Sequence, residues 1–141
     1  MKFKKEVVIA VCIIVFILVL EFVTNNISNR SVERISSEMN DLLILLKNIN
    51  ELKDKDELNP KDKESLNEKI ELLKNDWFEE QNKLSIFAEH DELEKVSKCI
   101  IVLEENVKNE EYIYAMVDGK EFLYWLDHFK DKDKIEIKNI F

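Results

Sequence analysis

The sequence predicts an all-α protein in which a single N-terminal transmembrane helix is followed by an antiparallel four-helix bundle. Only one Gly and one Pro occur among the 141 residues, too few for the many turns of an all-β domain. Apolar residues recur every three or four positions through most of the chain, which is the spacing of an amphipathic helix. An uninterrupted run of 14 apolar residues, Val7–Leu20, predicts the membrane helix.

The apolar segment Val7–Val23 is expected to anchor the chain in the lipid bilayer of the cell membrane. Its 17 residues rise ~1.5 Å each and span about 25 Å, close to the lower limit for a hydrocarbon core of ~30 Å. Glu21 lies within a turn of the end, where its carboxylate reaches the headgroups. Lysines at positions 2, 4 and 5 place the N-terminus in the cytoplasm by the positive-inside rule. We therefore expect an anchor over residues 1–24 and an extracytoplasmic domain over residues 25–141.

A cleaved signal peptide is the alternative interpretation, because a basic start and a short apolar run also fit that pattern. No A-x-A-like cleavage site follows the run, since Leu20-Glu21-Phe22 and Val23-Thr24-Asn25 are poor substitutes. Cys12 stands inside the run rather than at its end, which argues against a lipid-modified cysteine. We therefore expect an uncleaved anchor.

The extracytoplasmic domain is strongly acidic. Residues 25–141 contain 28 acidic and 18 basic residues, a net charge of −10. Nucleic-acid binding needs a basic surface, so no nucleic-acid partner is expected. The same charge disfavours adsorption of the domain to anionic lipid. The charges are expected to cover a solvated helical surface, with cation binding by clustered carboxylates as the alternative.

Four amphipathic helices are expected after the anchor. The first runs from about Asn25 to Lys53, and neither Pro nor Gly separates it from the anchor. Loss of apolar residues at Asp54–Glu57 marks a loop, and shifts of the apolar register mark breaks near Ala88–Asp91 and Lys108–Glu111. The four apolar seams are Ile35, Met39, Leu42, Leu46, Ile49 and Leu52; Leu66, Ile70, Leu73, Trp77, Leu84 and Phe87; Leu93, Val96, Ile100, Leu103 and Val107; and Tyr112, Ala115, Gly119, Phe122, Leu126 and Phe129.

Local signals indicate how these helices begin and pack. Asn59 can cap the second helix, with Pro60 at the first helical position. Asp91 is expected to cap the third helix, and Glu94 three residues later completes a capping box. Gly119 lies in the middle of the fourth apolar face, where we expect another helix to approach closely.

The C-terminal segment Ile135–Phe141 is apolar where a free terminus is usually polar. The fourth helix is expected to end near Phe129 and to be followed by a solvated run, Lys130–Lys134. We hypothesise that the segment folds back on the membrane-proximal end of the bundle near Phe87. Such docking is marginal, so Ile140 and Phe141 are also candidate partner-binding residues.

A second apolar stripe on the fourth helix lies roughly opposite its core seam and consists of Ile113, Val117, Tyr124 and His128. Either these residues touch the third helix or the tail, or they are exposed for a partner. We expect the contact within the chain, and we keep Ile113, Val117 and Tyr124 as candidate partner-binding residues.

The segment Glu89–Glu94 is the densest group of potential metal ligands. His90 and Glu94 are four residues apart and share a helix face, and the topology brings His128 to the same end. The Glu-x-x-His pairs of carboxylate-bridged di-iron bundles are missing from the sequence. Helix capping explains Asp91 and Glu94 without a metal, so neither a metal nor another cofactor is expected.

Catalytic motifs are also missing. The sequence has no Gly-x-Ser-x-Gly, no His-Glu-x-x-His and no phosphate-binding glycine loop. Trp77 and Trp125 are expected to pack within the bundle, and Cys99 is expected to be a small buried hydrophobe rather than a reactive thiol. We therefore expect no catalytic residues and no enzymatic activity.

Trp77, the segment Glu89-His90-Asp91-Glu92-Leu93 and the closing Asn139-Ile140-Phe141 resemble the bacterial membrane-anchored family DUF4363, a domain of unknown function. The resemblance extends over the whole chain, including the anchor. It implies an anchored all-α protein of Gram-positive type without an assigned activity, and it points to a multi-pass membrane protein as a partner.

The expected function is that of a non-enzymatic accessory or interaction module, held at the outer face of the membrane beside a partner. The alternative is an extracytoplasmic ligand- or metal-binding sensor that acts through a partner, and an enzyme ranks third.

Overall fold

The computed structural model describes residues 2–85 and 88–138, with side chains described for residues 5–20, 22, 23, 26, 29–85 and 88–128. This part of the chain forms four α-helices and no strand. Their bounds are α1 Lys2–Asp54, α2 Pro60–Leu84, α3 His90–Lys108 and α4 Tyr112–Lys138. The predicted all-α fold is confirmed.

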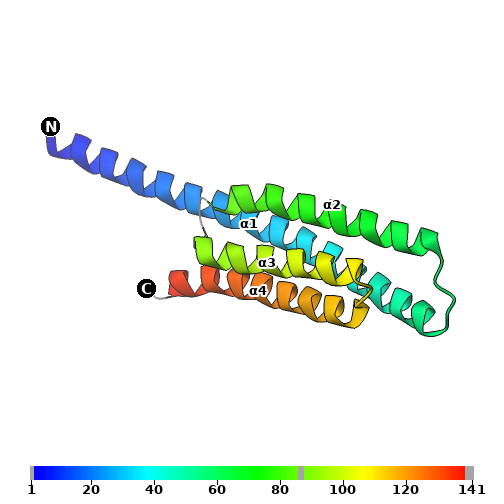
Figure 1. The fold of residues 1–141 in the computed structure, drawn as a ribbon. Coiled ribbons are helices and arrows are strands. Elements are labelled where there is room, and N and C mark those ends of the chain that lie inside the picture. The colour runs from blue at the N-terminus through cyan, green and yellow to red at the C-terminus, as the bar shows by residue number, and fades with distance from the viewer. Residues whose placement is uncertain (1, 86–87, 139–141) are drawn as a thin grey trace.

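The helices form a bundle in which neighbours along the chain are also neighbours in space. Contacts join α1 with α2, α2 with α3, α3 with α4, and α4 with α1. Successive helices run in opposite directions, and the two ends of the chain lie at the same end of the bundle (Figure 1). Short connections favour this up-down-up-down arrangement.

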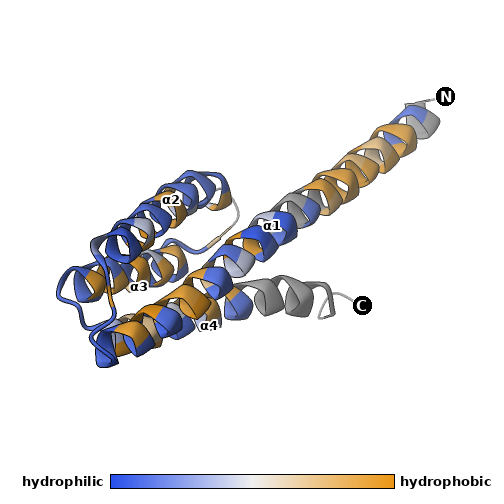
Figure 2. Cartoon of the chain, turned by 90° about the vertical axis from the view of Figure 1, so that its right-hand side faces the viewer, coloured by the Kyte–Doolittle hydropathy of each residue, from blue (hydrophilic) through white to orange (hydrophobic). Residues whose placement is uncertain are grey.

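Helix α1 is a single helix of 53 residues that extends well beyond the bundle (Figure 1). The expected continuity between the N-terminal segment and the first bundle helix is therefore confirmed. Figure 2 shows a continuous run of apolar residues in this projecting part, with hydrophilic residues between the run and the bundle. Among the residues that the structure describes, no helix combines the length and the apolar character needed to cross a membrane.

The connection between α1 and α2 follows the sequence signals. Asp56 adopts a left-handed backbone with φ of 58° in the turn after α1. Asn59 caps α2 through its side chain, which accepts a 3.1 Å hydrogen bond from the Asp62 amide, and Asp62 accepts one of 3.3 Å from the Asn59 amide. Pro60 is at the start of the helix. The cap and the restart at Pro60 are confirmed, and Asp62 completes a capping box.

The predicted cap of the third helix is wrong. Helix α3 begins at His90, and its N-cap is Glu89, whose side chain makes no capping hydrogen bond. Asp91 lies inside the first turn and is not the N-cap. Its negative charge interacts favourably with the positive end of the helix dipole. The predicted break near Ala88–Asp91 is nevertheless correct. Phe87 lies outside the described residues.

The predicted end of the fourth helix is also wrong. The break at Lys108–Glu111 is confirmed, with Glu110 at φ of 59° between α3 and α4. Helix α4 then continues past Phe129 to Lys138. Its final turns contain Lys and Glu, which are good helix formers, and neither Gly nor Pro. Charge alone therefore did not mark the end of the helix.

The core confirms the apolar seams within the described side chains. All predicted seam residues are buried except Leu52, which is half-buried, while Phe87 and Phe129 lie outside these side chains. Trp77 of α2 meets Phe122 of α4 edge to face, with ring centroids 5.7 Å apart. A Cβ added at Gly119 would lie only 2.7 Å from Leu43 Cδ2, so the expected close approach of another helix is confirmed.

Candidate functional site

The outer face of α4 carries an exposed stripe of mainly apolar residues, which we call the α4 outer stripe: Ile113, Val117, Tyr124 and His128. Exposed fractions are 61% for Ile113, 55% for Val117 and 62% for Tyr124. His128 is exposed as well. Since these side chains are exposed, α3 does not cover them, and the other expected contact, with the tail, lies outside the described residues. The tail residues Ile140 and Phe141 lie outside the described residues.

Aromatic contacts order the half of the stripe nearest the end of α4. The rings of Tyr124 and His128 stack with centroids 6.3 Å apart and an interplanar angle of 11°. Trp125 packs edge to face against both of them, and Lys95 Nζ of α3 lies 4.4 Å from the centroid of the Trp125 ring. Rings held by their neighbours lose little freedom on binding, which favours them as contact residues.

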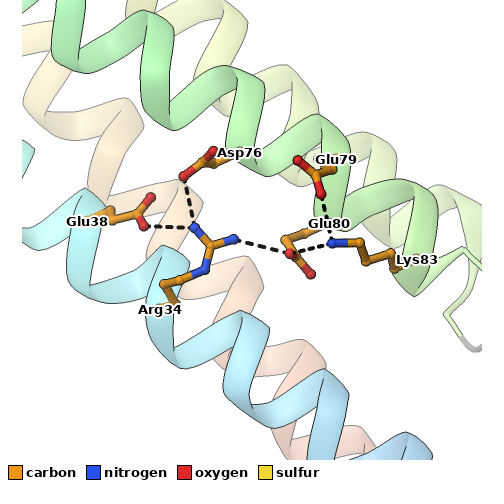
Figure 3. A network of polar contacts seen from close by, with 6 residues as sticks. All are labelled: Arg34, Glu38, Asp76, Glu79, Glu80 and Lys83. Atoms are coloured by element: carbon orange, nitrogen blue, oxygen red, sulfur yellow. Dashed lines mark hydrogen bonds and ion pairs between the residues drawn. The ribbon is translucent and has the colours of Figure 1, made fainter.

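A polar network joins α1 and α2 on another side of the bundle (Figure 3). Arg34 Nη1 donates to Glu38 Oε1 at 2.9 Å and to Asp76 Oδ2 at 2.8 Å. Arg34 Nη2 donates to Glu80 Oε1 at 3.1 Å. Lys83 reaches the same Glu80 oxygen at 3.0 Å, so the carboxylate has two cationic partners.

Glu80 is the buried member of this network, with 6% of the residue exposed. Burial acts to raise the pKa of its carboxyl, but hydrogen bonds from Ser31 and Lys83, together with the charges of Lys83 and Arg34, lower the pKa overall. The carboxylate therefore stays charged at neutral pH and ties α1 to α2. This arrangement explains Glu80 as a structural residue rather than a proton-transfer group.

A surface groove of about 290 Å³ lies beside this network between α1 and α2. Its apolar wall comes from Leu42, Leu72 and Leu73, and Lys69 is at its border. Its acidic border consists of Glu38, Asp41 and Asp76. Two of these carboxylates, Glu38 and Asp76, are already bound by Arg34.

The three metal-ligand candidates, His90, Glu94 and His128, are not gathered into a site. Among the residues that the structure describes, no group of three or more His, Cys, Asp or Glu side chains could hold a metal ion. His90 starts α3, and His128 stacks on Tyr124 of α4.

Cys99 and the tryptophans behave as packing residues. Cys99 is buried, and burial, followed by the nearby charges of Glu121 and Asp118, raises the pKa of its thiol to about 11. A thiol with such a pKa is a poor nucleophile at neutral pH, which confirms its expected role as a small hydrophobe. Trp77 is buried and Trp125 is half-buried against the core.

Sequence reasoning missed the network around Arg34 and the groove beside it. The spacing of Arg34 and Glu38 was a usable signal, because residues four apart share a helix face. The contacts with Asp76 and Glu80 depend on how α1 and α2 are aligned, and no local pattern gives that alignment.

These features define a small all-α bundle with a long N-terminal helix, whose first part is apolar, and an exposed apolar stripe. Comparison with family models matches residues 22–140 to the domain-of-unknown-function family DUF4363, and the chain belongs to this family. The resemblance to this family is thereby confirmed for residues 22–140, while residues 1–21 lie outside the matched region. Neither the curated proteins nor the solved structures contain a match to the chain.

Proposed function

We propose that this protein is a single-pass, membrane-anchored accessory module without enzymatic activity, whose helical bundle meets a membrane partner on the outer face of the cell membrane. The observation that carries the proposal is the continuity of α1. One helix contains both the apolar segment Val7–Val23 and the bundle core residues from Val32 to Ile49.

The surface of the projecting part of α1 supports the anchor. The large apolar residues between Val7 and Leu20 are 50–63% exposed, so apolar side chains cover every side of the helix. Such a surface is unfavourable in water and is well matched by lipid chains. The segment is short for a span, and charged residues flank it in the sequence, with lysines at positions 2, 4 and 5 and Glu21 at the other end. Long charged side chains that flank a short apolar segment can extend to the membrane interfaces.

The α4 outer stripe supports a protein partner. It combines aliphatic residues with an ordered aromatic group, the composition found at the centres of protein interfaces. A chain held by one helix places this stripe at a fixed side of its anchor. The anchor also holds the stripe close to the membrane that contains the partner, which raises the effective concentration of the two surfaces.

Site-specific photo-crosslinking in native membranes tests the proposed interaction. A benzophenone amino acid replaces Val117 or Tyr124 in the full chain, and Ile44 and Leu72 serve as matched controls because they are 61% and 65% exposed on other helices. We expect one defined adduct from positions 117 and 124 and none from positions 44 and 72. An adduct at twice the chain mass identifies a second copy as the partner. Equal yields at all four positions, or no adduct, reject the stripe as the contact surface.

The groove between α1 and α2 favours the alternative function, an extracytoplasmic sensor that acts through a partner. Its leucine wall and acidic border suit a small cation with an apolar body. Benzamidine is a suitable probe, and the alternative predicts that it raises the melting temperature of the full chain in detergent by mass action. Asp41→Asn should remove that rise. A melting temperature that benzamidine does not change rejects this ligand class.

A further inference from the structure

Two contacts define how α4 lies along α1. Gly119 of α4 packs against α1, where an added Cβ would lie 2.7 Å from Leu43 Cδ2 and 3.1 Å from Met39 Sδ. Further along α4, Asp127 borders a surface hollow together with Val32 and Ser36 of α1. The two helices are antiparallel, so each step forward in α4 corresponds to one step back in α1 (Figure 1).

This alignment can be continued to the end of α4. Position 119 is level with about position 41, and Asp127 lies beside the stretch 32–41 of α1, whose middle is near position 36. Lys138, the last residue of α4, lies 19 residues beyond Gly119 and 11 residues beyond Asp127. It is therefore level with about positions 22–25 of α1, because both helices rise by ~1.5 Å per residue. These positions are at the outer end of the apolar segment Val7–Val23. The helix therefore ends at the height at which the proposed anchor leaves the membrane.

The sequence at this height differs from the rest of the acidic domain. Residues 130–138 of α4 contain four lysines and three acidic residues, whereas residues 25–141 carry a net charge of −10. The apolar residues of this stretch are Ile135 and Ile137. Lysines combined with aliphatic residues are typical of segments that lie in the headgroup layer of a bilayer. The net charge of this stretch is +1, so the stretch itself does not repel anionic lipid as the rest of the domain does.

We infer that the C-terminal end of α4 lies in the outer headgroup layer of the membrane in which α1 is anchored, so that the bundle contacts lipid at two points. The inference rests on the proposed anchoring. It is an alternative to the expected fold-back of Ile135–Phe141 on the bundle near Phe87. Helix α4 continues to Lys138, and residues 139–141 and Phe87 lie outside the described residues. A second lipid contact limits tilting of α1 and the bundle relative to the membrane. It also holds the α4 outer stripe at a defined height, with His128 about 15 Å from the end of the helix.

Fluorescence quenching in vesicles tests this inference on the full chain. A polarity-sensitive nitrobenzoxadiazole probe is attached to single cysteines, and the protein is reconstituted in phosphatidylcholine–phosphatidylglycerol vesicles that contain spin-labelled lipid. Native Cys12 reports the anchor, and Ile137→Cys reports the end of α4. Lys138→Cys is a second reporter in case the loss of Ile137 disturbs the contact. Ser65→Cys on the exposed face of α2 is the solvent control. The reporters other than Cys12 are built on Cys12→Ala, and that variant alone gives the background from buried Cys99.

We expect strong quenching at Cys12 and several-fold more quenching at position 137 or 138 than at position 65. A spin label near the headgroup should quench the α4 probes more than one deep in the acyl chain. Quenching at Cys12 together with solvent-like behaviour at both α4 positions overturns the inference and leaves the anchor intact. A blue-shifted but unquenched α4 probe also overturns it, because the tail is then buried on protein. Lack of quenching at Cys12 overturns the anchoring itself, and the inference falls with it.

Discussion

Trp77 of α2 donates a 2.8 Å hydrogen bond from its indole Nε1 to the hydroxyl oxygen of Ser97 in α3, inside the core. Ser97 in turn donates to the Leu93 carbonyl at 2.9 Å, so the indole, the hydroxyl and the backbone form one buried chain. This is the one side-chain hydrogen bond between α2 and α3 in the described core whose two partners are both buried. It fixes the orientation of the largest core side chain.

Removing the hydroxyl should therefore leave the indole N–H buried without a partner. We expect Ser97→Ala to lower the free energy of unfolding by about 1–3 kcal/mol. Chemical unfolding of the full chain in a mild detergent, followed by circular dichroism, measures the change. In a Trp77→Phe background the same substitution should cost clearly less, because the donor is gone. Equal costs in the two backgrounds would show that the hydrogen bond contributes nothing.

Gly119 gives a prediction about the α1–α4 contact. Gly119→Val should lower the free energy of unfolding by about 1–3 kcal/mol, because its side chain must displace Leu43 and Met39. Gly119→Ala should lie within about 1 kcal/mol of the natural protein, since the helix propensity of Ala offsets the shift of the flexible tip of Leu43. Leu43→Ala shortens the side chain that a valine at position 119 would meet, so Gly119→Val should lower the free energy of unfolding by less in that background. A tolerated Val at position 119 without that truncation contradicts the close approach.

Stability should fall in acid through carboxylates that make ion pairs. Hydrogen bonds from Lys74 and Lys108 lower the pKa of Glu104. The contacts of Glu80 with Ser31, Lys83 and Arg34 lower the pKa of Glu80 in the same way. A carboxyl whose pKa is lower in the folded state stabilises the fold above its unfolded pKa and loses this contribution as the pH falls through the folded pKa. We therefore expect the free energy of unfolding to decline once the pH drops below about 4.5.

Two variants separate the contributions to this acid profile. Glu104→Gln should make the decline shallower. Burial raises the pKa of Asp118 despite the hydrogen bond from Asn106, so Asp118 contributes with the opposite sign and supports the fold at low pH. Asp118→Asn should therefore make the decline steeper. Identical profiles for both variants and the natural protein would exclude these groups as its cause.

Cys99 should resist modification in the folded protein. Its burial and its pKa of about 11 keep the thiol protonated at pH 7, so a maleimide should label it only after unfolding in denaturant. Cys12→Ala isolates this residue, and mass spectrometry counts the attached labels. Fast labelling of Cys99 under native conditions would mean that the α3–α4 contact opens readily.

The helices were predictable because burial imposes a period on the sequence. Residues such as Met39, Ile70, Ile100 and Phe122 recur with the helical spacing, and only one side of each helix can face the core. The break at Pro60 was visible for a local reason, since Asn followed by Pro specifies a helix start. The cap of α3 was not predictable in the same way. Glu89, Asp91 and Glu92 are adjacent acids, and the chain path before His90 decides which of them precedes the helix.

The candidate site was only partly predictable. The pattern of α4 identifies Val117 and Tyr124 as a stripe opposite the core, but whether α3 covers it depends on how the helices are rotated against each other. Arg34 and Glu80 are far apart in the sequence and meet only through the alignment of α1 with α2. Such contacts follow from tertiary packing, which a single sequence does not reveal.

The central proposal, an anchored chain with its bundle outside the cell, is tested most directly by cysteine labelling in intact cells. The full chain carries Ser65→Cys on the exposed face of α2 and Cys12→Ala. Cys99 is buried, so the maleimide should not label it in the folded protein. A membrane-impermeant maleimide should label position 65 before the cells are opened, and the labelled protein should remain with the membranes after alkaline extraction. Labelling only after the membrane is breached, or release of the full chain into the soluble fraction, would contradict the proposal.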